Sequence, residues 1–501
     1  MELREQELTE LRPKGHSYQV VVIETAIKFL VTGLNSLRGI AKNFKILALH
    51  WIWSTPNFNT IRQWSLRLGL YELNRAKEYR EDWIFILDMT IELGTLKCLV
   101  ILGIPQEQLT RIIQKEQRSL QHEDVEILSL NIMDKSPGIM ILEKLRNLAE
   151  RVGTPVQIIS DWGSDIKKGI DLYKQDNPEV ITTYDITHKM ANLLKKELFP
   201  DEIFHDFLQL CSITRLRIQQ TKLYFLIPPK QRDKSRYHNL DILVEWAVKV
   251  IKYEAQQDFS SISTTYNLDN EAILPLSFIL SKDTLKNLKK IPIKTYENRQ
   301  KFNQALLNYL GEELWQSHGE IICRYSDLGR RKFYDKLGWL FYYQHNIQIY
   351  VEMLTQIRSV HIQLKTQGLH SQSPQQWLNT ISNHSFTLRG QKFQSKIIEY
   401  LMLEANQVPE SQILLGTSDV IESLFGKYKF FTARRPIKDI GTNILLIPLF
   451  TLKITTSQVE KAMESISFAN VDSWVKSVFS SSMLSQRRSL SLLPTLDTET
   501  A

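Results

Sequence analysis

The sequence predicts an α/β protein, with a mixed β-sheet core that is interrupted by a large, mostly α-helical block and preceded by an all-helical region. Three observations support this fold class. Apolar residues recur at helical spacing over 1–80. Short apolar runs then alternate with amphipathic helical segments over 81–200. Helical spacing alone returns over 201–410, a compact pattern follows over 411–479, and the Ser/Thr-rich tail 480–501 is expected to be disordered.

The composition fits a globular chain with a polyanionic partner. Hydrophobic residues make up 43% of the 501 positions and charged residues 23%, which is ordinary for a globular protein of several domains. The net charge is +7 and the pI is near 9.0. The three cysteines lie far apart, which fits a reducing compartment and neither a disulfide framework nor a zinc site. No signal peptide is visible and the apolar stretch 444–452 is too short to span a bilayer, so we expect a cytoplasmic protein without a membrane partner.

The N-terminal region contains three segments with helical spacing, which begin near residues 18, 36 and 59. The polar faces of the third segment carry Arg62, Gln63 and Arg67. Three short helices with basic residues on the last are typical of a helix-turn-helix DNA-binding region. A helical cap over the next domain is the alternative.

A β-hairpin with two buried strands is predicted next. The apolar run that begins at Trp83 ends at Asp88, and a second apolar run, 96–104, follows the turn-prone Gly94 and Thr95. An ionised carboxylate among apolar neighbours is costly unless a metal ion, Arg or Lys pairs with it. Asp88 is therefore a candidate metal ligand, and a solvated strand-end carboxylate is the alternative.

Three more strands and three helices complete this region. Strands are expected at 125–132, 155–160 and 180–184, and helices at 139–151, 164–174 and 186–198. The order β-β-β-α-β-α-β-α makes the fourth and fifth strands parallel to the first, which matches the RNase H-like fold. Asp88 and Asp161 then follow neighbouring strands at their carboxyl ends, where α/β sheets bind ligands. Further along, Ser418 is expected to cap a helix that carries Glu422.

Together, Asp88, Asp161 and Glu422 resemble the catalytic triad of the DDE transposases, which have an RNase H-like core. In that family the first Asp lies on the first strand, the second follows the fourth strand, and the Glu lies on a late helix. The helical block falls where several members, including the hAT type, carry an insertion. The lysines after Glu422 are similar to those of bacterial insertion-sequence transposases.

A second motif agrees with this resemblance. Residues 184–189, Tyr-Asp-Ile-Thr-His-Lys, look like the Cys/Asp-x-x-His element that follows the fifth strand in many such transposases. The resemblance therefore implies that Asp185 and His188 are neighbours of the active site. By itself, a His is more often a hydrogen-bonded structural residue.

The resemblance also implies a chemistry and its partners. The three carboxylates would hold two Mg²⁺ ions, with Mn²⁺ as a substitute, because hard cations prefer oxygen ligands. The enzyme would cut DNA at transposon ends and join these ends to target DNA. It would act as a homodimer or higher oligomer on DNA, associated with the nucleoid in a prokaryotic cytoplasm.

Several assignments stay open at this point. Asp165, one helical turn past Asp161, is either an N-cap or an alternative ligand, and Asp161 is favoured because it ends the strand. Glu92 is a paired surface carboxylate or a further ligand, and Asp419 complements the dipole of the helix that carries Glu422. The basic residues that follow this helix contact DNA phosphates or form a solvated face; they are Lys427, Lys429, Arg434 and Arg435.

Other functions also stay open. A domesticated or inactive relative would bind DNA without cutting it, and a structure-directed nuclease would cut without joining. A helical DNA-binding regulator would have no metal site, and it predicts that Asp88, Asp161 and Glu422 lie far apart. Trp315, Trp339 and Trp377 are expected in the core, with a stack on a flipped base as the alternative for one of them.

Overall fold

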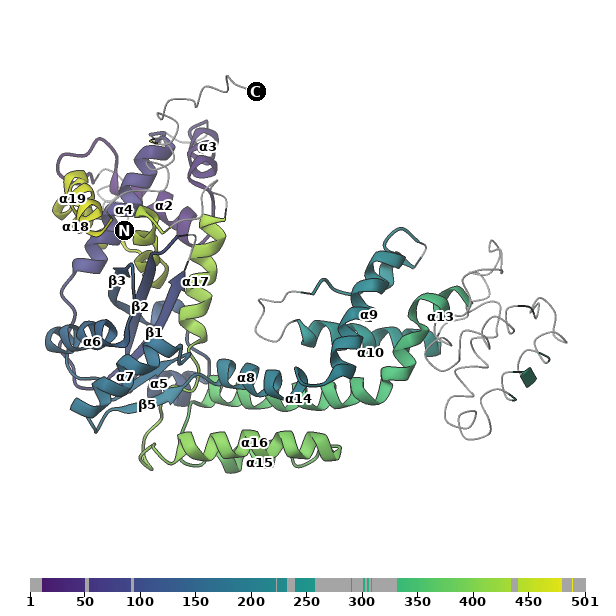
Figure 1. Ribbon diagram of the computed structural model, residues 1–501. Coiled ribbons are helices and arrows are strands. Elements are labelled where there is room, and N and C mark those ends of the chain that lie inside the picture. Colours follow the sequence, from purple (N-terminus) through teal and green to yellow (C-terminus); the bar gives the residue numbers. More distant parts are fainter. Residues whose placement is uncertain are drawn as a thin grey trace, which may run out of the picture. The chain divides into compact units, whose positions relative to one another are not determined.

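The computed structural model describes residues 11–49, 54–91, 94–221, 223–231, 239–256, 331–433 and 440–479, together with six single positions between 290 and 489. The chain forms two compact units (Figure 1). Unit 1 consists of Met1–Lys189, Val360–Leu378 and Tyr400–Ala501, and unit 2 consists of Met190–Ser359 and Asn379–Glu399. The tail predicted at 480–501 lies outside the described residues except for position 489.

Unit 1 contains a five-stranded mixed sheet with the order β3-β2-β1-β4-β5. Strand β1 pairs antiparallel with β2 and parallel with β4; β2 pairs antiparallel with β3, and β4 pairs parallel with β5. This confirms the predicted α/β class, and the order and directions are consistent with an RNase H-like fold. The strands are β1 (Trp83–Ile91), β2 (Lys97–Pro105), β3 (Glu126–Met133), β4 (Gln157–Ser160) and β5 (Ile181–Tyr184).

The two faces of the sheet are covered by different helices. Phe85 and Leu87 of β1 pack in a core with α6 (Gly138–Val152) and α7 (Ser164–Asp176). Ile84 and Ile86 of the same strand pack on the opposite face, because successive side chains of a strand alternate. That second core contains α17 (Asp419–Thr432), so we call this side of the sheet the α17 face.

The three N-terminal helices belong to the core of unit 1. They are α2 (Val20–Val31), α3 (Leu37–Leu47) and α4 (Phe58–Asn74). Residues of all three helices lie in the same apolar cluster as the α17 face of the sheet. Helix α4 also packs closely against the 3₁₀ segment η7 (Thr442–Thr451), where a Cβ at Gly69 would collide with the carbonyl group of Leu445.

Two helices near the C-terminus complete this side of the unit. Helices α18 (Thr456–Ser465) and α19 (Phe468–Val478) both contact α4. As a result, α4 has eight buried residues and contacts other elements on most of its circumference. Helices at the N-terminus were expected. In the structure they share one apolar core with the α17 face of the sheet.

The described part of unit 2 is helical, as expected for the block between the strands and Glu422. Its core contains Phe207, Trp339 and Tyr350, whose rings contact one another through Phe207, and Trp339 donates a hydrogen bond to Thr214 at 2.8 Å. Its elements include α9 (Glu202–Ile218), η3 (Tyr224–Leu226), α10 (Leu240–Gln256), α13 (Arg331–Leu337) and η6 (Gly338–Tyr343).

Further helices contribute residues to both units, among them α8 (Ile186–Leu198), α14 (Gln344–Gln367) and α16 (Leu388–Ala405). Helix α15 (Ser373–Ile381) lies between the last two in sequence, and its Trp377 is buried. Trp315 lies outside the described residues. A search of the described helices found none that is both long enough and apolar enough to span a membrane.

Candidate active site

Asp88 and Asp161 lie on two neighbouring parallel strands. The predicted position of Asp88 at a strand end is wrong, because β1 continues to Ile91, whereas Asp161 directly follows β4. The register pairs Ile84 of β1 with Gln157 of β4 and continues to Leu87 and Ser160, so the two aspartates follow the last registered pair. Both are in phase with side chains on the α17 face, Asp88 with Ile86 and Asp161 with Ile159. The alternation of the strands therefore directs both carboxylates to the same side of the sheet.

The carboxylate of Asp88 has an unusual electrostatic environment. Burial and the negative charge of Asp161 raise the pKa of Asp88 to about 7, although a hydrogen bond from the Met89 amide at 2.6 Å and the charges of His188 and Lys429 oppose the shift. Two carboxylates this close cannot both ionise without cost. A bound cation would remove this cost.

Glu422 reaches the same place from α17, which packs against β1. Its Oε1 lies 2.7 Å from Nε2 of His188, and the charge of His188 also acts on Asp88. We call Asp88, Asp161 and Glu422 the carboxylate cluster: Asp161 acts on Asp88 directly, and Glu422 is connected to Asp88 through His188. That the three carboxylates share one metal site stays a prediction.

Asp185 connects the first residues of α8 with those of α17. Its side chain is fully buried after β5, Oδ2 accepts a hydrogen bond from the His188 amide at 2.9 Å, and Oδ1 accepts one from the Ser418 amide at 2.6 Å. It therefore fixes the starts of α8 and α17. The predicted side-chain cap by Ser418 is wrong, because this hydroxyl makes no capping bond and Thr417 accepts from the Asp419 amide instead, at 3.2 Å.

Asp419 anchors the first turn of α17 through three partners. Thr187 donates to Oδ1 at 3.1 Å, while Nε2 of His361 and Nζ of Lys365 lie 2.8 and 3.1 Å from Oδ2. Burial alone would raise the pKa of Asp419, but His361 and Lys365 hold it far below its usual range. From the sequence alone, Asp419 is expected only to complement the helix dipole. Its partners on α14 had no recognisable signal beyond the spacing of four residues between His361 and Lys365.

Trp162, directly after Asp161, has the left-handed backbone conformation with φ of 53°. For a bulky residue this conformation is strained and persists only where the surroundings enforce it. The indole stacks on Tyr184 with ring centroids 4.7 Å apart, and Nζ of Lys167 lies 4.9 Å from its ring centroid. The sequence analysis did not identify this feature, which fixes the chain direction just past a cluster carboxylate.

Asp165 lies apart from the carboxylate cluster. Its Oδ2 accepts a hydrogen bond from Ser136 at 3.0 Å and lies 3.8 Å from Nζ of Lys97, at the start of β2. Asp161 acts on Asp88, whereas Asp165 has Ser136 and Lys97 as partners; the choice of Asp161 as the metal ligand stays a prediction. Glu92, Arg434 and Arg435 lie outside the described residues.

The basic residues suggested for DNA binding on α4 have mixed surroundings. Arg67 donates to the backbone carbonyl groups of Met463 and Ile466, and its burial lowers the pKa of the guanidinium. This gives Arg67 a clear intramolecular role. DNA contact by Arg62 and Gln63, both partly buried, stays a prediction.

A second set of ligand atoms overlaps the carboxylate cluster. Within the described part of the chain, ligand atoms of Asp185, His188 and Glu422 lie within 4.8 Å of one another. Both oxygens of Asp185 already accept backbone hydrogen bonds, so it is better placed to orient His188 than to bind a metal. Comparisons with protein-family models and with curated protein sequences found no match to this chain.

Proposed function

We propose that this protein is a metal-dependent DDE transposase, which cuts DNA at transposon ends and joins them to target DNA. The observation that carries the proposal is the pair Asp88 and Asp161 on neighbouring strands of a sheet with the order β3-β2-β1-β4-β5, with Glu422 on the helix that packs against β1. These residues come from a hairpin strand, a parallel strand and a helix far downstream. Phosphodiester chemistry at paired metal ions needs such a set of converging carboxylates.

The residues present fit divalent cations of the Mg²⁺ type. The cluster offers only carboxylate oxygens, which hard cations prefer, and burial together with the charge of Asp161 raises the pKa of Asp88. Asp88, Asp161 and Glu422 would hold two Mg²⁺ ions, with Mn²⁺ as a substitute. When bound, the ions would activate the attacking hydroxyl group and stabilise the leaving oxygen.

The surrounding residues position this cluster. His188 contacts Glu422 directly, and Asp185 orients both His188 and the start of α17. Asp419 ties the same turn to α8 and α14. Lys429 acts electrostatically on Asp88 from α17 and is therefore suited to bind a DNA phosphate beside the cluster.

The experiment is cleavage and joining of DNA that carries the sequences flanking the gene, in Mg²⁺, by the wild type and four single variants. We expect Asp88→Ala, Asp161→Ala and Glu422→Ala to lose cutting by at least about 100-fold and to keep DNA binding. Asp165→Ala is the matched control because it removes a neighbouring carboxylate outside the cluster. It should keep cutting.

Two results would contradict the proposal in different ways. A wild type that binds DNA and never cuts it in Mg²⁺ or Mn²⁺ would indicate a domesticated or inactive DNA-binding relative. Cutting that survives Asp161→Ala and fails in Asp165→Ala would retain the enzyme and replace one ligand of the cluster. Cutting without joining would indicate a nuclease.

A further inference from the structure

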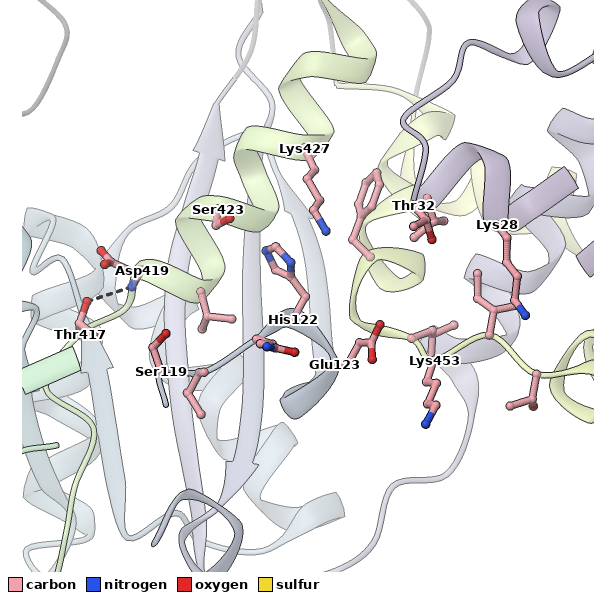
Figure 2. A pocket seen from close by; sticks show the side chains of 18 of the residues that line it. Lys28, Thr32, Ser119, His122, Glu123, Thr417, Asp419, Ser423, Lys427 and Lys453 are labelled. Carbon is pink, nitrogen blue, oxygen red and sulfur yellow. Dashed lines mark hydrogen bonds between the residues drawn. The ribbon is translucent and has the colours of Figure 1, made fainter. Parts of the chain in front are cut away.

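A pocket of about 880 Å³ lies on the other flank of α17 (Figure 2). Within α17, Val420, Ser423 and Lys427 line this pocket at spacings of three and four residues, so they share one side of the helix. Glu422 and Lys429 share another side, which faces Asp88. The α17 pocket is therefore separate from the carboxylate cluster but formed by the same helix.

Several elements of unit 1 build the rest of the wall. Helix α2 contributes Lys28 and Thr32, the loop before β3 contributes Ser119 and His122, and the segment from η7 to α18 contributes Lys453 (Figure 2). His122 begins a short 3₁₀ turn, His122–Asp124. None of these elements supplies a residue of the carboxylate cluster.

Four lysines and three carboxylates line the pocket, and two of these lysines have no ion-pair partner among the described residues, which gives their part of the wall an affinity for anions. Lys28 is paired with Glu24 at 2.5 Å and Lys365 with Asp419 at 3.1 Å. Lys427 lies within ion-pair distance of no acidic group in the described ranges, although the charge of Glu123 acts on it. Lys453 is likewise without such a partner there. An exchangeable anion would supply the missing negative charge.

A buried imidazole nitrogen next to Lys427 also lacks a partner. Nε2 of His122 is shielded from solvent and makes no hydrogen bond within the described part of the structure. Burial and the charge of Lys427 lower the pKa of His122 to about 4, so the ring is neutral at pH 7 and its nitrogens can donate or accept. Since buried polar groups are nearly always satisfied, this nitrogen points to a polar ligand.

Part of the remaining wall is apolar and suits a flat or sugar-like group. Apolar side chains line part of the wall, among them Val31, Leu120, Phe450 and Leu452, and hydroxyl, amide and carboxylate side chains line the rest. The volume lies in the range of pockets that hold small organic ligands or single residues of a polymer. This combination matches a nucleotide. The lysines suit its phosphate, the imidazole suits the polar edge of its base, and the apolar side chains suit the face of its ring.

We propose that the α17 pocket binds one nucleotide, with its phosphate at Lys427 and a polar edge at His122. The source of this nucleotide is a single DNA strand that continues past the carboxylate cluster, so the proposal rests on the proposed function. A free mononucleotide offers the same chemistry from another source. One side of α17 would then contribute to the cutting and joining of DNA, and the other side would bind the DNA strand.

The test measures binding of a fluorescent single-stranded DNA oligonucleotide in EDTA, where metal-dependent cutting cannot occur. We expect Lys427→Gln to weaken binding about 5- to 20-fold and to reduce the slope of log K against log salt concentration by roughly 0.7, as for one lost phosphate contact on a single strand. His122→Leu should weaken binding and His122→Gln should restore part of it. Lys461→Gln is the charge-matched control, because Lys461 is exposed on α18 outside the pocket.

A second variant distinguishes a blocked pocket from a misfolded protein. Ser423 is exposed at the pocket, so Ser423→Trp should block it without removing a core contact, and circular dichroism should be unchanged. Equal binding by Ser423→Trp, Lys427→Gln and the control would overturn the proposal. Binding of deoxyadenosine monophosphate that depends on Lys427, with no such dependence for the oligonucleotide, would support a nucleotide site and reject a DNA strand as its source.

Failure of the proposed function gives a different pattern. A wild type that never cuts DNA, combined with pocket variants that bind the oligonucleotide more weakly than the control, would reject the transposase and keep the pocket. Normal cutting by a wild type whose pocket variants bind DNA as the control does would keep the transposase and reject the pocket.

Discussion

His188 is the residue that connects the carboxylate cluster with its support. Its ring contacts Glu422 and acts on Asp88, while its amide is held by Asp185. Residues that orient metal ligands in this way are often worth 10- to 100-fold in activity. We therefore expect His188→Ala to lower metal-dependent cutting by about that factor and to leave DNA binding in EDTA unchanged.

The control for His188 is His384→Ala, which removes an exposed imidazole in unit 2. His188→Gln can keep one hydrogen bond to Glu422 and should recover part of the activity. Full cutting by His188→Ala would show that Glu422 needs no support from this ring.

Glu404 is expected to make the free energy of unfolding depend on pH, independently of catalysis. Burial raises the pKa of Glu404 to about 7, although a hydrogen bond from the Tyr184 amide and the charges of Lys189 and Lys174 oppose the shift. The folded state thus holds this proton more tightly than the unfolded state, whose pKa is near 4.5. The resulting stability is fully present below about pH 4.5 and is lost as the pH rises through 7.

Glu404→Gln removes this ionisation. Relative to the wild type, the free energy of unfolding should rise by about 2–3 kcal/mol at pH 8 and by less than about 1 kcal/mol at pH 5. Urea unfolding at both pH values measures the difference, and Glu399→Gln, at an exposed position of the same helix, should show none. A gain of equal size at both pH values would contradict a raised pKa.

At the scale of elements, two helical glycines distinguish close packing from chain flexibility. A Cβ at Gly69 of α4 would collide with the carbonyl group of Leu445 in η7, whereas a Cβ at Gly426 of α17 would meet nothing within 4 Å. Gly69→Ala should therefore lower the free energy of unfolding by roughly 2–4 kcal/mol, as for other overpacked cores. Gly426→Ala should raise it by about 0.5–1 kcal/mol through helix propensity.

Chemical denaturation of both variants measures this contrast. A neutral Gly69→Ala would mean that α4 and η7 can move apart at little cost. A destabilised Gly426→Ala would mean that another group covers the side of α17 that carries Gly426.

Most elements of the sheet could be predicted because local patterns determine them. The apolar runs that end at Asp88 and Asp161 are strands, and the alternation that buries Ile86 and Ile159 also places both aspartates on one face. The hairpin turn at Gly94 has the positive φ of 109° that glycine tolerates. Local sequence therefore determines two members of the carboxylate cluster and their common direction.

Features that depend on distant contacts could not be predicted in this way. The side-chain cap expected from Ser418 is absent, because Asp185 and Thr417 bind the adjacent amides. The left-handed Trp162 is stabilised by Tyr184, which is adjacent only after β4 and β5 pair. The α17 pocket likewise draws its wall from helices, a loop and a 3₁₀ segment that lie hundreds of residues apart.

For the whole molecule, the packing of the N-terminal helices decides which parts can fold alone. The sequence places a DNA-binding region at 1–80, yet five apolar side chains of α2 and α4 are fully buried in the core beneath α17: Val22, Ile23, Ile27, Ile61 and Leu68. Each such side chain contributes about 1.5–3 kcal/mol when buried. Their sum is comparable to the total stability of a typical domain, about 5–15 kcal/mol.

We therefore expect a chain of residues 81–501 to lose the native fold of unit 1. It should show no cooperative thermal unfolding and should bind a hydrophobic dye, whereas co-expression with a fragment of residues 1–80 should restore both soluble protein and metal-dependent cutting. Cooperative unfolding of 81–501 alone would show that the N-terminal helices form a separate domain, and their burial against the sheet would then contribute little to stability. Restoration by the fragment would instead show that the helices complete the core on which Asp88, Asp161 and Glu422 are held.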